Sequence, residues 1–275
     1  METIEGHLYD FPRYYDLVFG SDWKAEFDFL VKCFPKHATG SVEKVFEPAC
    51  GTGRLLYRLA KAGYQVSGLD LNDKAVAYCN QRLRRHGFAD TAFVADMTDF
   101  RLQSEIDAAF NMINSFRHLQ TGDAARDHLM CVANSLRRGG VYVLGLHLTP
   151  TNVEPSEHES WSAARGSLCV NTRLWMIERD LDERLERFCM TYDVYTPTRS
   201  FQIQDSIAFR TYTAPQMTEL IDSIDDLEVA ATYDFAYAID RPIVVDSSTE
   251  DVVYVLRKRS ARLNSRAART RRVTS

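Results

Sequence analysis

The chain has 275 residues, of which 45% are hydrophobic, 26% charged and 11% aromatic, and its formal net charge is −5. This ordinary composition excludes disordered and fibrous classes, and the length suits one domain with an elaboration or two small ones. No apolar run approaches the roughly 18 residues of a membrane-spanning helix, and the N-terminus METIEGHLYD does not resemble a signal peptide. Six scattered cysteines without a C-x-x-C pair predict a reduced, cytoplasmic protein without a structural metal.

An aromatic segment precedes the first regular pattern. Residues 8–20 read LYDFPRYYDLVFG, and apolar side chains then recur at helical spacing over residues 22–34. This spacing predicts an amphipathic helix that ends before Pro35, because proline lacks the backbone N–H that a helix interior requires.

Residues 45–70, VFEPACGTGRLLYRLAKAGYQVSGLD, organise the rest of the chain. A short apolar strand closes on Glu47, and the turn that follows, residues 48–53, consists of small residues that let the backbone pass close to a ligand. A helix over 54–62 comes next, and a second strand follows that ends at Asp70. A glycine turn, a helix N-terminus and an acid about 20 residues further on predict half of a doubly wound nucleotide site, with the acid bonded to a ribose.

The spacing of this turn does not fit a pyrophosphate site. A dinucleotide-binding turn reads G-x-G-x-x-G, but Leu56 takes the place of the last glycine, and the chain contains no P-loop. Glu47, Gly51 and Gly53 instead fill the pattern [DE]-x-x-x-G-x-G. With this pattern the chain resembles the class I S-adenosylmethionine (SAM) dependent methyltransferases. Ala49 stands at the position where the turn of that family usually has its first glycine. A degenerate nucleotide fold and an oxidoreductase are the alternatives.

The resemblance implies a doubly wound, Rossmann-like α/β sheet of seven strands, SAM as methyl donor, and a set of SAM contacts. In related enzymes a tyrosine-rich segment folds over SAM as a lid, and Tyr14 and Tyr15 match it; alternatively they anchor an N-terminal strap to the sheet. Arg54 either contacts the SAM carboxylate or closes its helix over the turn. The predicted cofactor-binding set is Tyr15, Glu47, Ala49, Cys50, Gly51, Gly53, Arg54, Asp70, Leu71, Asp96, Met97, Asn111 and Asn114.

The second half of the predicted sheet begins after Asp70. A helix capped by Asn72 or Asp73 leads to a strand over 92–95, which Asp96 and Met97 follow. By resemblance, Asp96 accepts a hydrogen bond from the adenine amino group and Met97 packs on the adenine face. The alternative for Asp96 is a helix or turn cap.

A fourth strand over 107–114, a helix over 122–138 and a fifth strand over 141–148 come next. Ligands of doubly wound sheets lie beyond the carboxyl ends of the strands, at the switch point of the strand order. That point lies here between the first and fourth strands. Residues 111–118 are therefore expected to form the wall nearest the methyl donor.

The run N-S-F-R-H-L at 114–119 resembles the S-[IF]-x-H-L segment of small-molecule N-methyltransferases, including sugar N,N-dimethyltransferases. It does not read N-P-P-[YF], the signature that holds an adenine or a glutamine amide. By resemblance, His118 contacts the acceptor, and Tyr14 is the second candidate for a catalytic role. A histidine after a core strand is also often structural, and His147 at the end of the fifth strand has no motif in its support. An amine acceptor must arrive as the free base.

The period of the sequence changes after the fifth strand. Residues 149–165 are polar and predict a loop, whereas residues 167–212 alternate apolar and polar side chains and predict three antiparallel strands. By resemblance, this β insertion covers the substrate or forms a dimer surface. A helix and two strands complete the fold, at 214–223, 227–235 and 252–257. The predicted units are an N-terminal lid and helix (1–40), a SAM-binding core (41–150 and 213–257), the insertion (151–212) and a basic tail (258–275).

Charge is unevenly distributed. Residues 257–275 hold eight Lys or Arg and no acid, so that removing this +8 from the net −5 leaves the body at −13. Enzymes that bind nucleic acid usually carry a basic face, so the acidic body argues against that class. The tail is predicted to be a disordered solubilising extension rather than a nucleic-acid or membrane anchor.

We therefore expect a SAM-dependent methyltransferase of a small molecule, most simply at an amine nitrogen, without a membrane partner and with a homodimer as a candidate assembly. A protein or RNA methyltransferase that docks through the tail is the second hypothesis. A SAM-binding module without turnover is the third.

Overall fold

The computed structural model describes residues 1–21, 23–151 and 158–260, and their strands form two sheets. The core sheet has the strand order β11-β12-β6-β5-β2-β3-β4, in which β2 to β6 run parallel and β12 runs antiparallel to both neighbours. This sheet confirms the predicted doubly wound fold. Its strands are β2 (Lys44–Pro48), β3 (Gln65–Asp70), β4 (Ala92–Val94), β5 (Ile106–Asn111), β6 (Leu136–His147), β11 (Leu227–Tyr233) and β12 (Asp251–Lys258).

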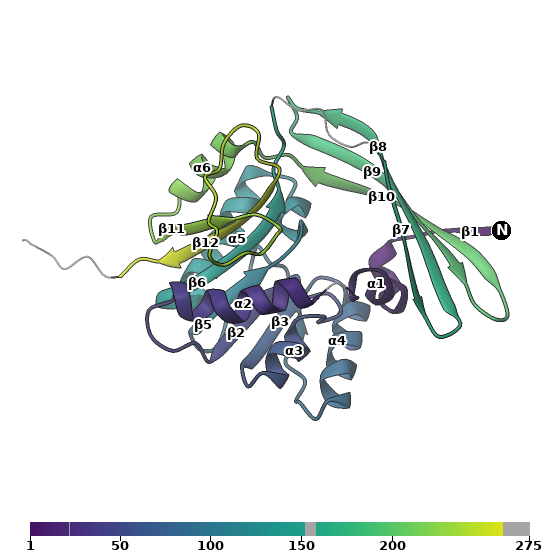
Figure 1. Cartoon of the computed structure of the whole chain (residues 1–275), viewed down its shortest axis with the longest axis horizontal. Helices are drawn as coiled ribbons and strands as arrows, with labels where there is room; N and C mark the ends of the chain where they lie inside the picture. Colours follow the sequence, from purple (N-terminus) through teal and green to yellow (C-terminus); the bar gives the residue numbers. More distant parts are fainter. Residues whose placement is uncertain (22, 152–157, 261–275) are drawn as a thin grey trace, which may run out of the picture.

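Helices cover both faces of the core sheet (Figure 1). Alternate residues of each strand contact opposite layers, because successive side chains of a strand point to opposite faces. Val141 and Val143 of β6 pack with one set of helices, whereas Tyr142 and Leu144 pack with the other. The first set is α2 (Lys24–His37), α3 (Leu56–Lys61) and α4 (Asp73–Arg85), and the second is α5 (Gly122–Ser135) and α6 (Ala214–Asp222).

The second sheet stands beside the core and has the order β1-β10-β9-β8-β7. Its strands are β1 (Glu2–Glu5), β7 (His158–Arg165), β8 (Leu168–Asp180), β9 (Leu185–Tyr195) and β10 (Ser200–Arg210). The three antiparallel strands predicted over 167–212 correspond to β8, β9 and β10. The loop predicted over 149–165 is wrong for residues 158–165, which form β7 and pair antiparallel with β8. β1 was not predicted, and it pairs parallel with β10.

A helix of the N-terminal segment lies between the two sheets. The short turn η1 (Leu8–Asp10) and α1 (Pro12–Phe19) pack against the apolar face of the second sheet (Figure 1). Leu17 and Val18 join Tyr192 and Ile203 in one buried cluster. The N-terminal segment is thereby held between the second sheet and the core.

Several predicted boundaries are corrected by the structure. α2 continues through Pro35 to His37, because the proline falls in the last turn, where it removes only one hydrogen bond while Phe34 is fully buried. The helix predicted to reach residue 138 ends at Ser135, because the backbone turns extended at Leu136 and pairs there with β5. Among the described residues, no helix is both long and apolar enough to cross a membrane.

The last strand also runs further than predicted. Lys258, expected to begin the tail, is the final residue of β12, and its ammonium donates to the carbonyl of Leu136 at 2.7 Å. Arg259 also donates to a main-chain carbonyl, that of Leu227, at 3.0 Å. The first residues of the basic run therefore belong to the fold, and residues 261–275 lie outside the described residues.

Candidate functional site

The turn after β2 has an unusual backbone. Ala49, Gly51 and Gly53 have φ angles of 54°, 51° and 66°, in the left-handed region that favours glycine. A Cβ on Gly53 would lie 2.3 Å from the Cys79 sulfur, so this glycine is required for the packing of α4. A Cβ on Gly51 would meet only the Tyr15 ring, at 4.0 Å, so Gly51 borders open space.

Cys50 has a packing role within this turn. It is 4% exposed, and a hydrogen bond with Cys79, together with burial, raises the pKa of its thiol well above the ordinary value. The thiol is therefore protonated at neutral pH and is not a nucleophile.

Asp70 at the end of β3 stabilises the turn after β2 by hydrogen bonds. One carboxylate oxygen accepts from the Gly51 N–H at 2.8 Å, and the other accepts from the Asn72 N–H at 2.9 Å. Burial raises the pKa of this carboxyl, although the backbone donors oppose the rise. Asn72 caps α4 by accepting from the Ala75 N–H, and the adjacent Leu71 side chain is exposed.

Three polar atoms around the turn lack a hydrogen-bond partner among the described residues: Oε2 of Glu47, Nη1 of Arg54 and Oδ1 of Asn111. All three atoms are buried, and an unpaired buried polar atom costs about 1–3 kcal/mol. The other bonds of these side chains are made within the protein, Arg54 to Glu26 at 2.6 Å and Asn111 to the Pro48 carbonyl at 2.7 Å. Two acceptors and one donor thus remain for a ligand.

The charges of this group are mixed. Burial raises the pKa of Glu47 well above its ordinary value, although the Arg54 guanidinium opposes the rise. Burial lowers the pKa of Arg54, but the carboxylates of Glu26 and Glu47 outweigh burial and raise it overall. A ligand that carries both an ammonium and a carboxylate would complement this pair.

Asp96 and Met97 follow β4. Asp96 is exposed, and its Oδ1 accepts from both the N–H and the hydroxyl of Thr98 at 2.8 Å, so this carboxylate does cap a turn. Met97 packs against the core, and its carbonyl is 3.0 Å from Nδ1 of the buried His128.

The two predicted tyrosines of α1 face different surroundings. Tyr15 lies by Gly51, and its ring centroid is 5.3 Å from that of Tyr9. Tyr14 instead packs in the apolar cluster of the second sheet, 5.9 Å from the Phe201 ring. Tyr14 therefore packs on the second sheet, and its catalytic role stays a prediction.

His118 is paired with Tyr9, a residue that the sequence reasoning did not single out. Nε2 of His118 lies 2.8 Å from the Tyr9 hydroxyl, and the Phe209 ring packs 4.9 Å from the imidazole. Burial, with His7 and Arg117, lowers the pKa of His118 to about 4. Burial, with Tyr15 and Asp70, raises that of Tyr9 well above its ordinary value. The pair is uncharged at neutral pH.

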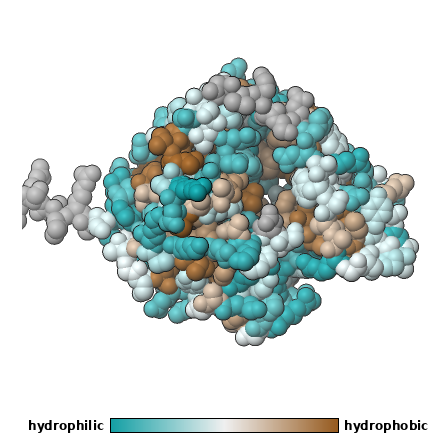
Figure 2. All heavy atoms as spheres, viewed as in Figure 1, coloured by the Kyte–Doolittle hydropathy of each residue, from teal (hydrophilic) through white to brown (hydrophobic). Residues whose placement is uncertain are grey.

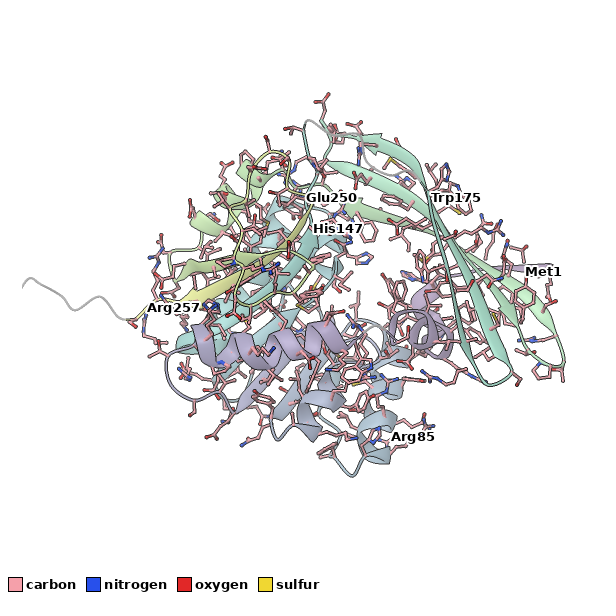
Figure 3. The ribbon with its side chains drawn as sticks, viewed as in Figure 1. Met1, Arg85, His147, Trp175, Glu250 and Arg257 are labelled. Atoms are coloured by element: carbon pink, nitrogen blue, oxygen red, sulfur yellow. The ribbon has the colours of Figure 1, made fainter. Side chains whose placement is uncertain are left out.

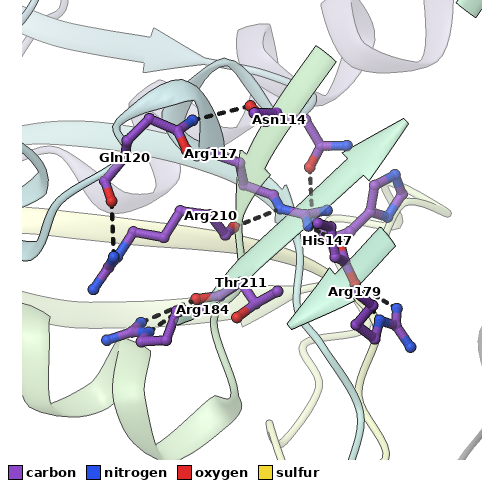
Figure 4. Close-up of polar contacts among 10 residues, drawn as sticks. Asn114, Arg117, Gln120, His147, Arg179, Arg184, Arg210 and Thr211 are labelled. Carbon is purple, nitrogen blue, oxygen red and sulfur yellow. Dashed lines mark hydrogen bonds and ion pairs between the residues drawn. The ribbon is translucent and has the colours of Figure 1, made fainter. Parts of the chain in front are cut away.

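The segment that carries His118, η2 (Ser115–His118), is tied to the second sheet by a buried network (Figure 4). Arg117 forms an ion pair with Glu186 of β9, and Glu186 also binds Arg179 of β8. Nε of Arg117 donates to the Arg210 carbonyl of β10 at 3.0 Å. Removing one partner of such a buried pair is costly, so the network fixes His118 against the sheet.

The carboxyl end of β5 is strained. Ile113 and Asn114 have φ angles of 55° and 66°, and a β-branched residue with positive φ is a rare conformation that concentrates at functional sites. Oδ1 of Asn114 accepts from the His147 N–H at 2.8 Å, and Nδ1 of His147 lies 2.7 Å from Asp251. Figure 3 shows His147 on the side of the core that faces the second sheet.

The described side chains leave an opening between the core and the second sheet, visible at the centre of Figure 2. They include no group of three or more His, Cys, Asp or Glu residues placed to hold a metal ion. Tyr15 connects the glycine turn, at Gly51, with the Tyr9–His118 pair.

Residues 45–140 match a family described as a methyltransferase domain. This match runs from β2 into the start of β6 and includes Glu47, Asp70, Asn111 and His118.

A curated relative of known sequence is also named as a methyltransferase. The chain is 28% identical over 138 residues to dTDP-3-amino-3,4,6-trideoxy-alpha-D-glucopyranose N,N-dimethyltransferase of Streptomyces venezuelae, which covers 49% of the chain and 56% of the relative. It spans about half the length of the curated relatives that it matches.

Two solved structures share the fold over nearly the whole chain. An S-adenosylmethionine-dependent methyltransferase of Clostridium acetobutylicum has a TM-score of 0.74 at 17% identity, over 92% of this chain and 100% of the other. SAM-bound CalS10, an amino pentose methyltransferase of Micromonospora echinaspora, has a TM-score of 0.71 at 17% identity, over 94% and 100%.

Proposed function

We propose that this protein transfers a methyl group from SAM to an amine nitrogen of a small, sugar-like acceptor. The observation that carries the proposal is the set of unpaired buried atoms on Glu47, Arg54 and Asn111 beside the glycine turn. One donor and two acceptors complement the carboxylate and the ammonium of an amino acid, the groups at one end of SAM. The amino-sugar enzymes among the relatives support the acceptor class.

When bound, SAM supplies an electrophilic methyl group for in-line displacement by the acceptor. In the proposed site Arg54 binds the carboxylate, and Glu47 with Asn111 binds the ammonium. Asp70 accepts the ribose hydroxyls, beside its bonds to the Gly51 and Asn72 N–H groups.

The remaining predicted contacts serve the other parts of the cofactor. Asp96 and Met97 flank the adenine, together with Leu71. Tyr15 covers Gly51 as part of the N-terminal lid. Asn114 acts through the backbone, because its side-chain oxygen already holds the His147 N–H.

The Tyr9–His118 pair serves the acceptor in this proposal. Both groups are neutral, so they present a hydrogen-bond donor and an acceptor to an uncharged amine without attracting its ammonium form. With a pKa of about 4, His118 is too weak a base to deprotonate an ammonium ion at neutral pH. The pair therefore orients the free amine and excludes water, and orientation is a large part of the catalysis of such displacements.

The pH dependence tests this role of His118. Because a pKa of about 4 keeps the imidazole neutral above about pH 5, kcat/KM is expected to rise with pH along the titration of the acceptor amine alone. A His118→Phe variant keeps the ring against Phe209 and loses the hydrogen bond, which is worth about 0.5–1.5 kcal/mol, so kcat/KM should fall about tenfold or less. Its pH profile should keep the wild-type shape. A break near the ordinary histidine pKa that disappears in the variant would instead identify His118 as a general base.

The proposed activity itself is tested with SAM labelled in its methyl group. We expect label to enter an amino-sugar nucleotide and not the matched compound in which a hydroxyl replaces the amine. Label in the hydroxyl compound alone would assign the reaction to oxygen. Binding of SAM without transfer to any member of a metabolite panel would favour a module without turnover.

The hypothesis of a protein or RNA substrate is tested by removing residues 261–275, since Lys258 and Arg259 belong to the fold. Unchanged transfer to the small amine, with no transfer to RNA or protein by the full chain, is the expected result. The homodimer stays a prediction, for which the outer edge strands of the second sheet are the candidate surface.

A further inference from the structure

A second hollow lies between α1, α3, α4 and the end of β7, and it is lined by four arginines. Its volume is about 280 Å³, and Arg58, Arg82, Arg85 and Arg165 line it together with one carboxylate, Asp16. Figure 3 shows Arg85 on α4, on the side toward the lower end of the hairpin that β7 and β8 form. None of the residues proposed to bind SAM or the acceptor lines this hollow.

The single carboxylate does not balance the four cations. Asp16 is 1% exposed, and it forms ion pairs with Arg82 and, at 3.7 Å, with Arg165. It also accepts from the hydroxyls of Thr52 at 3.2 Å and Tyr78 at 3.3 Å, so its lone pairs are already used. The walls therefore keep an excess of positive charge.

Contacts with neighbouring groups hold Arg58 at the wall of the hollow despite the repulsion between the arginines. The Arg58 guanidinium lies over the rings of Trp23 at 4.0 Å and Tyr57 at 4.4 Å, and it donates to the Arg54 carbonyl. Burial and the neighbouring Arg82 lower the pKa of Arg58 to about 10. The Arg85 side chain forms no hydrogen bond or ion pair with any part of the chain that the structure describes. An anion in the hollow would relieve this unbalanced charge.

We propose that this hollow is a binding site for a phosphate or diphosphate group. The planar guanidinium fork binds phosphate oxygens in pairs, which makes arginine the preferred residue for phosphate recognition. Four such groups around about 280 Å³ match an anion of two or more charges and not a monovalent ion. The group is either free in solution or part of a phosphorylated metabolite, because both present the same oxygens.

The site adjoins the glycine turn. Arg82 donates to the Thr52 carbonyl at 3.0 Å, and the Thr52 hydroxyl donates to Asp16. A bound phosphate would thus share Arg82 with the turn that carries Gly51 and Gly53.

The proposal is tested by calorimetry on the full chain with inorganic phosphate, pyrophosphate and uridine diphosphate, each at an ionic strength held constant with chloride. We expect saturable binding that is tighter for pyrophosphate than for phosphate. Arg85→Gln and Arg165→Gln should each weaken it about tenfold or more, since a charge-assisted hydrogen bond is lost. Arg84→Gln is the matched control, because Arg84 lies on the same helix and pairs with Asp90 outside the hollow.

Both tested side chains are exposed, so the variants should keep the circular dichroism spectrum and melting temperature of the wild type. Tighter binding of uridine diphosphate than of pyrophosphate would identify a phosphorylated metabolite as the source of the group, and the reverse would identify the free anion. The proposal is overturned if none of the three compounds binds saturably, or if Arg84→Gln weakens binding as much as Arg85→Gln does.

Discussion

A Gly51→Val variant is expected to lose measurable SAM binding while remaining folded. Gly51 has a φ of 51°, a conformation that costs an L-residue about 1–2 kcal/mol and a β-branched residue more. The protein itself leaves room for the first carbon, since the nearest atom, on Tyr15, is 4.0 Å away. The added methyl groups would therefore occupy space in front of the turn that the ligand requires. Calorimetric titration with SAM measures the loss, and thermal unfolding measures the fold.

Two neighbouring substitutions separate ligand exclusion from damage to the fold. Gly51→Ala should weaken SAM binding less than valine does, because it adds one carbon in place of three. Gly53→Ala should lower the melting temperature, because its Cβ would lie 2.3 Å from the Cys79 sulfur. Wild-type affinity for SAM in Gly51→Val would mean that the ligand does not approach this turn.

Replacing Asp70 with alanine is expected to weaken SAM binding by about 1.5–3 kcal/mol, or roughly ten- to 150-fold, the worth of hydrogen bonds to a charged group. Part of this loss acts through the turn, because the Gly51 and Asn72 N–H groups lose their acceptor. Calorimetry at low and moderate salt measures the effect. Salt should change it little, because the carboxylate is half-buried and bonded to two main-chain N–H groups.

Asp96→Ala is the matched comparison for Asp70→Ala. Asp96 also follows a core strand, but its carboxylate is exposed and already bonded to Thr98, so the loss of affinity should be smaller. An equal or larger loss in Asp96→Ala, together with unchanged binding in Asp70→Ala, would remove Asp70 from the ribose role.

The glycine turn and the sheet around it could be predicted because their signals are local. Glu47, Gly51 and Asp70 lie within 24 consecutive residues, and the apolar runs of β2, β3 and β6 are buried on both faces. Short-range spacing of this kind survives folding, because the βαβ unit brings its strand ends together wherever it occurs.

The acceptor side could not be predicted in the same way. Tyr9 and His118 are 109 positions apart, and their contact depends on α1 being held between the core and the second sheet. The aromatic segment 8–20 marked the region, but only the fold decides that Tyr9 meets His118 while Tyr14 packs on Phe201.

The missed strands have a related cause. β7 is mostly exposed, and only Trp161 and Ala163 pack on the apolar cluster, so its sequence lacks the clear alternation that predicts a strand. Backbone pairing with β8 chiefly defines it. β1 is likewise exposed along most of its length and pairs only with β10.

The most direct test of the account is a crystal structure of the protein with S-adenosylhomocysteine. We predict its ribose at Asp70, its amino-acid end at Arg54, Glu47 and Asn111, and its sulfur on the side of Tyr9 and His118. A structure that places the nucleoside elsewhere, or that finds Glu47 and Arg54 bonded to each other across an empty turn, would contradict the account.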